Sequence, residues 1–255
     1  MLGAMLSVSD TAFAIAAIRA QEGERAAPER LFADPYASIF VAAGAHAREG
    51  VEHFLGLPFF CDAIRLRTRF IDDLVRESSD PQLVLLGAGF DARALRIPEI
   101  AERGARVYEV DFSEQLANKR ALLEAAAVPR PSWVQDVACD FNDTSFDVAL
   151  EAALDARGFR RGASTLFVWE GVVAYLDDGA IDRTLRFIAR TGGKGSRVVF
   201  DGVLGRFDPE SAGAPTVRAG FARCDHVGFD ALWRRYLPGE PHENAALVRM
   251  FVASV

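Results

Sequence analysis

From residue 82 onward the sequence alternates between short apolar runs and longer segments with helical spacing. The strand-like runs are QLVLL, RVYEV, SWVQDVA, TLFVWE and SRVVFDGV, and ALVRMFVASV closes the chain. The helical segments between them are ARALRIPEIAERG, SEQLANKRALLEAAA, DVALEAALDARG and DGAIDRTLRFIARTGG. Continuous apolar strands separated by helices are typical of a parallel sheet covered on both faces. The sequence therefore predicts an α/β, Rossmann-like fold.

Composition and charge exclude several classes of protein. The net charge of −7 argues against a nucleic-acid partner, since phosphates require a basic surface. The cysteines Cys61, Cys139 and Cys224 lie far apart, so we expect no metal site, no disulfide framework and a reducing, cytoplasmic compartment. The first 20 residues carry no basic leader and no long apolar run, so we expect neither a signal peptide nor a membrane span.

A glycine-rich turn, Gly87-Ala88-Gly89, follows the first strand-like run. In open parallel sheets, ligands bind beyond the carboxyl ends of the strands, near the first strand. Glycine permits a tight turn and a close approach of the backbone to a ligand. Residues 87–92 also fit the G-x-G-x-x-G/A dinucleotide fingerprint. The turn therefore predicts a ligand site, although it could also serve connectivity alone.

Acidic residues follow three of the other strand-like runs. Asp111 has the spacing of a carboxylate that accepts hydrogen bonds from ribose hydroxyls, which NAD and S-adenosylmethionine both carry. Asp140 could accept from an adenine amino group, and Phe141 could pack against the ring. Glu170 points to the same edge of the sheet.

Asp91 and Arg93, which follow the glycines, discriminate between NAD and S-adenosylmethionine. Asp91 and Arg93 crowd the start of the next helix, and a carboxylate in that position opposes a pyrophosphate. Three acids at strand ends suit ribose, amino and sulfonium groups better than two phosphates. The pattern therefore favours S-adenosylmethionine over NAD.

Six motifs, in order, carry a resemblance to a known family. They are DPYA, RTRFIDD, LLGAGFDAR, YEVDFSE, ACDFND and EGVVAYL. Together they resemble the leucine carboxyl methyltransferase family, including its bacterial small-molecule O-methyltransferase members. The resemblance implies a seven-stranded, mostly parallel class I methyltransferase sheet whose last two strands form an antiparallel closing pair.

The resemblance also implies roles for individual residues. Arg69 would pair with the methionine carboxylate of the cofactor, with Arg67 as the near alternative. The other expected cofactor contacts are Gly87 and Gly89 to the methionine and ribose portions, Asp111 to the ribose, Asp140 and Phe141 to the adenine, and Glu170 to the methionine amino group.

We expect a single domain over residues 1–255. Residues 1–80 read as helical and would form a lid or extension, or pack ordinarily against the sheet. Residues 81–255 would form the cofactor-binding core. Within the core, a Gly- and Pro-rich segment at about 202–230 would cover the substrate.

The expected activity is S-adenosylmethionine-dependent O-methylation of a small molecule, on a carboxylate or phenol of a polyketide or another secondary metabolite. An ionised carboxylate needs no general base, whereas a phenol benefits from one. No histidine stands in a strand-end motif, so we assign no catalytic residue, and Tyr175 is a candidate for the acceptor pocket. Three alternatives stay open: a methyltransferase for a protein's C-terminal leucine, an NAD(P)-dependent oxidoreductase and a non-catalytic binding protein. The acceptor and the oligomeric state cannot be read from the sequence.

Overall fold

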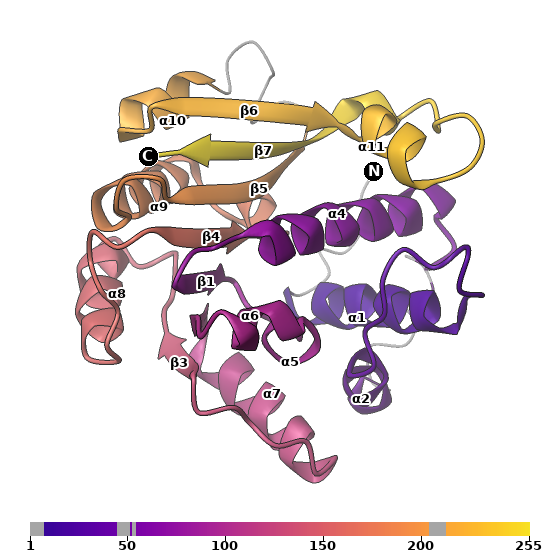
Figure 1. The fold of residues 1–255 in the computed structure, drawn as a ribbon, viewed down its shortest axis with the longest axis horizontal. Helices are drawn as coiled ribbons and strands as arrows, with labels where there is room; N and C mark the ends of the chain where they lie inside the picture. The colour runs from indigo at the N-terminus through magenta and orange to yellow at the C-terminus, as the bar shows by residue number, and fades with distance from the viewer. Residues whose placement is uncertain (1–7, 45–51, 53–54, 204–212) are drawn as a thin grey trace.

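Seven strands form one sheet in the order β3-β2-β1-β4-β5-β7-β6 (Figure 1). The computed structural model describes residues 8–44, 52, 55–203 and 213–255. The strands are β1 (Gln82–Leu86), β2 (Arg106–Asp111), β3 (Val134–Ala138), β4 (Thr165–Trp169), β5 (Arg197–Val203), β6 (Arg223–Gly228) and β7 (Val248–Ser254). The helices of the described residues are α1 (Val8–Glu24), α2 (Ala37–Ala43), α4 (Pro58–Glu77), α5 (Arg93–Arg96), α6 (Pro98–Glu102), α7 (Ser113–Ala125), α8 (Phe146–Asp155), α9 (Asp178–Thr191), α10 (Gly213–Ala219) and α11 (Phe229–Tyr236).

Helices cover both faces of the sheet, as the apolar strands require. All five residues of β1 are buried, and they alternate between the two faces. Val84 and Leu86 belong to a core cluster with residues of α8 and α9, whereas Leu83 and Leu85 pack with residues of α4, α6 and α11. Burying each such side chain contributes about 1.5–3 kcal/mol to folding. The predicted α/β, mostly parallel architecture is confirmed.

The last strand closes the sheet in the reverse direction. β7 pairs antiparallel with both β5 and β6, and Phe200 of β5 lies opposite Phe251 of β7. These two rings stack with their centroids 5.2 Å apart. The antiparallel closing pair expected from the resemblance is therefore present.

Strand β6 is the strand that the sequence pattern missed. Its sequence, RCDHVG, carries polar and charged side chains, and most of its residues are exposed or half-buried at the edge of the sheet. An edge strand lacks the continuous apolar run of a central one. Part of the segment expected to cover the substrate forms α10 and β6, and residues 204–212 lie outside the described ranges. Its role as a cover stays a prediction.

The helical region after β1 is interrupted where one helix was expected. α5 ends before Ile97, whose backbone is extended at φ −105° and ψ 97°, and α6 begins at Pro98. Proline lacks an N–H and disfavours the helical conformation of the residue before it. The segment ARALRIPEIAERG therefore forms two short helices.

The N-terminal helices α1 and α2 lie on the side to which the β1 and β6 arrows point (Figure 1). They pack around Phe90, which follows the glycine turn. The ring centroid of Phe90 lies 4.9 Å from that of Phe13 in α1 and 4.7 Å from that of Phe40 in α2. Helices from the first third of the chain therefore adjoin the carboxyl ends of the parallel strands. Within the described ranges, no helix combines the length and the apolar character needed to cross a membrane.

Candidate active site

The glycine turn is held in a conformation that suits only glycine. Gly87 and Gly89 have φ values of +72° and +44°, in the left-handed region. A Cβ atom on Gly87 would lie 2.2 Å from Cγ2 of Val172. The N–H groups of Gly87 and Ala88 both donate to the carbonyl of Val110, at 2.8 and 3.0 Å. The turn is thus fixed between the ends of β2 and β4.

Asp111, at the end of β2, is tied to this turn. Its Oδ2 accepts the N–H of Gly89 at 2.6 Å, and its Oδ1 accepts the N–H of Phe112 at 2.7 Å. Burial raises the pKa of the Asp111 carboxyl, and the two backbone donors together with the charge of Lys119 offset part of that rise. The ring of Phe112 is 41% exposed beside this carboxylate. Sequence reasoning overlooked Phe112, although its position directly after the acid was the available signal.

Asp140 and Phe141 follow β3, and their surroundings differ. Asp140 is exposed, and its Oδ1 accepts the N–H of Asn142 at 2.9 Å. Phe141 is buried in the core, where its ring meets that of Phe146 edge-on at 5.3 Å. Asp140 lies near Asp111, because the N–H of the neighbouring Cys139 donates to the Asp111 carbonyl at 2.9 Å. The adenine role expected of both residues stays a prediction.

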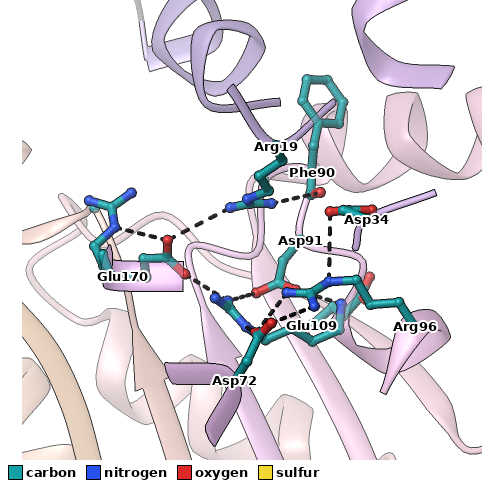
Figure 2. A network of polar contacts seen from close by, with 12 residues as sticks. Arg19, Asp34, Asp72, Phe90, Asp91, Arg96, Glu109 and Glu170 are labelled. Atoms are coloured by element: carbon teal, nitrogen blue, oxygen red, sulfur yellow. Dashed lines mark hydrogen bonds and ion pairs between the residues drawn. The ribbon is translucent and has the colours of Figure 1, made fainter. Parts of the chain in front are cut away.

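Glu170, directly after β4, lies at the centre of a charged cluster (Figure 2). Its Oε1 accepts Nε of Arg67 at 2.9 Å, and its Oε2 accepts Nη1 of Arg93 at 2.6 Å. Nη2 of Arg19, from α1, lies 3.7 Å from Oε1. Burial opposes ionisation of this carboxylate, but the guanidiniums of Arg93, Arg67 and Arg19 outweigh it and hold the pKa of Glu170 well below its usual range. These contacts therefore favour the ionised form of Glu170 and fix its orientation.

Arg67, rather than Arg69, lies at the strand ends. Besides Glu170, Arg67 donates from Nη1 to Oδ2 of Asp201 at 2.8 Å. Arg69 instead donates to Asp73 at 2.9 Å and to the carbonyl of Leu31 at 2.8 Å, and its side chain is 35% exposed. Two residues along a helix differ by about 200° in direction, so these arginines lie on opposite sides of α4. The structure thus places Arg67, the alternative to Arg69, in contact with Glu170, whereas Arg69 points toward Asp73.

Asp91 is paired rather than free. Its Oδ1 accepts the N–H of Arg93 at 2.7 Å, and its Oδ2 accepts Nη1 of the same arginine at 2.5 Å. The sequence position of Asp91 predicts a free carboxylate that opposes a pyrophosphate. Because the guanidinium of Arg93 neutralises Asp91, Asp91 does not by itself disfavour a dinucleotide. The preference for S-adenosylmethionine rests instead on the charge cluster around Glu170.

Tyr175 connects the β4 end to the N-terminal helices. It lies in the short 3₁₀ helix η2 (Val173–Tyr175), and its ring is partly exposed. Its hydroxyl donates to Oγ1 of Thr11 in α1 at 2.9 Å. Tyr175 is therefore at the junction between the expected lid and the strand ends, and its place in an acceptor pocket stays a prediction.

Buried N–H groups without an acceptor show whether this cluster could bind the amino-acid portion of a cofactor. Nη2 of the fully buried Arg93 has no hydrogen-bond partner among the residues that the structure describes, and neither do the buried Nη2 of Arg67 and Nε of Arg19, two arginines whose side chains are each 8% exposed. A buried N–H without an acceptor costs about 1–3 kcal/mol, so such groups normally have a partner. A carboxylate placed beside Arg67 and Arg19 would satisfy their donors, while Glu170 could accept from an ammonium group. The residues present therefore fit the methionine portion of S-adenosylmethionine.

Comparison with known proteins agrees with this chemistry. A family model for leucine carboxyl methyltransferase matches residues 12–189, which include Arg67, the glycine turn, Asp111 and Glu170. A relative from Parafrankia sp. (strain EAN1pec), named as an S-adenosyl-L-methionine-dependent methyltransferase, is 36% identical over 207 residues, covering 78% of this chain and 64% of the relative. One with the same type of name from Rhodococcus jostii (strain RHA1) is 31% identical over 258 residues, covering 96% of this chain and 77% of the relative.

A solved structure of a methyltransferase from Thermobifida fusca YX shares the fold. It superposes with a TM-score of 0.56 at 17% identity, covering 82% of this chain and 88% of the other. The chain spans less than two thirds of the length of the Parafrankia relative, at 64%. The family match covers well over half of the chain, from residue 12 to residue 189. The chain belongs to the leucine carboxyl methyltransferase family.

Proposed function

We propose that this chain is an S-adenosylmethionine-dependent O-methyltransferase acting on a small molecule. The observation that carries the proposal is the charge pattern across the glycine turn. On one side, Asp111 is anchored by backbone N–H groups, and on the other, Glu170 is surrounded by arginines. A nucleoside joined to a zwitterionic amino acid matches that pattern from end to end.

In this proposal the cofactor lies across the glycine turn with its methionine portion toward β4. Arg67 binds the methionine carboxylate through its unpartnered Nη2, and Glu170 accepts from the amino group. Gly87 and Gly89 let the cofactor approach the backbone near the sulfur and ribose. Asp111 accepts from the ribose hydroxyls, and Phe112 and Asp140 flank the adenine. Arg69 is left to its pairing with Asp73.

When bound, the cofactor supplies a methyl group on a positively charged sulfur. An acceptor oxygen would take this methyl group as the carbon–sulfur bond breaks, with the electron pair of that bond left on sulfur. The protein's contribution is to align the two partners and exclude water, and alignment can be worth about 7–11 kcal/mol in favourable cases. Arg19 and Thr11 bring α1 against this site, which supports a role for α1 as its cover.

A carboxylate is the acceptor that the site supports best. It is ionised at neutral pH and needs no base, whereas a phenol with a pKa near 10 does. Among the described histidines, His226 lies on the edge strand β6 and His242 lies before η3 (Ala245–Leu247). The other two, His46 and His53, lie outside the described residues. A polyketide or similar secondary metabolite with a carboxyl group fits this requirement.

Incubation with methyl-labelled S-adenosylmethionine tests the proposal. The panel contains small carboxylic acids, phenols and a peptide that ends in leucine. We expect label in a methyl ester of one of the small acids and none with a Glu170→Gln variant. Labelling of the peptide alone would contradict the small-molecule assignment. Absence of transfer to every acceptor, together with no binding of S-adenosylhomocysteine, would contradict the proposed activity.

A further inference from the structure

Arg93 joins three separate parts of the molecule through one buried guanidinium. Its Nε donates to Oδ1 of Asp72 in α4 at 2.8 Å. Its Nη1 donates both to Asp91, after the glycine turn, at 2.5 Å and to Glu170, after β4, at 2.6 Å. Figure 2 shows the side chains of Asp72, Asp91 and Glu170, from these three parts of the chain, gathered in one charged network.

The side chain of Arg93 is completely buried, with 0% exposure, whereas those of Glu170 and Arg67 are each 8% exposed. A ligand arriving from solvent therefore reaches Glu170 and Arg67 first. Arg93 lies behind Glu170, on the side of Oε2, while Arg67 holds Oε1. Both oxygens are thus fixed, and each retains a lone pair because a carboxylate oxygen can accept two hydrogen bonds.

A planar guanidinium fixes carboxylate geometry more strictly than an ammonium group does, since its N–H groups point in set directions. Glu170 follows the end of β4 and borders Gly171, whose φ of +69° marks a turn. Without Arg93, Glu170 would keep its charge partner Arg67 but lose the anchor that sets the direction of its second oxygen.

We propose that Arg93 is a positioning residue that aims Glu170 at the amino group of the cofactor's methionine portion. This inference rests on the proposed function. It assigns to Arg93 a task in recognition without contact with the cofactor. It also explains why the turn residue Asp91 and the α4 residue Asp72 share this one cation: both hold the guanidinium against Glu170.

Arg96 provides a matched control for a purely structural role. It lies on the same short helix, its side chain is only 2% exposed, and it also binds Asp72, through Nη1 at 2.5 Å and Nη2 at 2.7 Å. Its other ion pair is with Asp34 at 3.7 Å. Among the contacts of the described residues, Arg96 has none with Glu170. Replacing it therefore removes a buried arginine from Asp72 and leaves Glu170 in place.

The test measures how strongly the protein prefers a ligand with the amino group. Calorimetric titration compares S-adenosylhomocysteine with its analogue that lacks the α-amino group, in the wild type, Arg93→Lys and Arg96→Lys. A charge-assisted hydrogen bond corresponds to about 10- to 100-fold in affinity. We expect Arg93→Lys to reduce the preference about tenfold while affinity for the analogue stays within about twofold, as for one such bond. Arg96→Lys should leave the preference unchanged.

Three results would overturn the assignment. These are an unchanged preference in Arg93→Lys, an equal loss of affinity for both ligands in that variant, and the same reduced preference in Arg96→Lys. Arg93→Gln, which is shorter and lacks the guanidinium, carries the same expectation and is measured alongside in case the lysine variant does not fold. If the wild type binds neither ligand, the proposed function fails instead, and that outcome is distinct from the three above.

Discussion

The carboxylates at the ends of β2 and β4 flank the same glycine turn, yet their surroundings are opposite. Asp111 is held by two backbone N–H groups and makes no ion pair among the described residues. Burial raises its pKa. Glu170 contacts the guanidiniums of Arg67 and Arg93, which keep its pKa well below the usual range.

This difference indicates which part of a ligand each side can hold. Ribose hydroxyls are neutral donors, and a carboxylate bound only by dipoles keeps oxygens free to accept from them. An ammonium and a carboxylate on one carbon need both charges matched, and the cluster around Glu170 offers both signs. In the proposed complex, Asp111 therefore lies on a nucleoside side of the site and Glu170 on an amino-acid side.

The largest expected effect is on the stability of the amino-acid side. Glu170→Gln removes the shared anion of Arg67 and Arg93, so it should lower the free energy of unfolding by about 3–5 kcal/mol, as for a broken buried pair. Urea unfolding followed by circular dichroism measures it. The control is Asp225→Asn, whose pair with Arg223 is exposed and should contribute no more than about 1 kcal/mol. Equal losses for the two variants would contradict a special role for the cluster.

Ligand affinity should distinguish the roles of Arg67 and Arg69 in α4. Arg67→Gln should weaken S-adenosylhomocysteine binding about 10- to 100-fold, because one charged hydrogen bond to the methionine carboxylate is lost. Arg69→Gln should change it less than about twofold, since Arg69 binds Asp73 and the Leu31 carbonyl. Calorimetric titration provides both values. A larger effect at Arg69 would reverse the assignment made from the structure.

The nucleoside side should respond to pH where the amino-acid side does not. The ionised form of Asp111 accepts from the ribose hydroxyls more strongly than the protonated form, and its pKa is raised, so affinity should fall on acidification at a higher pH than for an ordinary aspartate. Glu170 stays ionised in that range because its pKa is lowered. Asp111→Asn should bind about tenfold more weakly at neutral pH and show a flat profile, as for one lost charged bond. A variant that kept the acidic decline would place its origin elsewhere.

The smallest expected effect on affinity concerns Phe112, the aromatic residue next to Asp111. Phe112→Leu should weaken binding about two- to tenfold, the range of an aromatic contact beyond its buried area. Its matched control is Phe141→Leu, which affects a core ring and should lower the unfolding temperature while leaving affinity nearly unchanged. If Phe141→Leu instead weakened binding more than Phe112→Leu, the adenine role expected from the sequence for Phe141 would be supported.

Central elements of the fold were readable from the sequence because burial imposes a pattern on them. β1 and β4 are buried along their full length, and their residues are apolar except for the first of each, Gln82 and Thr165. β6 was not recognised in the sequence because it is an edge strand of the sheet and most of its side chains are polar. The break at Ile97 was missed, although Pro98 signals it.

The site was readable to the extent that strand ends define it. Asp111 is the last residue of β2 and Glu170 directly follows β4, and parallel strands bring such residues to one edge. The choice between Arg67 and Arg69 depends on how α4 is rotated against the sheet, which spacing alone does not fix. Nor does the sequence pair Arg93 with Asp72 and Glu170, because those contacts join residues 21 and 77 positions apart.

A crystal structure of the complex with S-adenosylhomocysteine tests the two-sided site most directly. We predict the ligand's carboxylate within hydrogen-bond distance of Nη2 of Arg67, its amino group on Glu170 and its ribose hydroxyls on Asp111. A ligand lying in the reverse direction, with the amino acid near Asp111, or bound away from the glycine turn, would contradict this account.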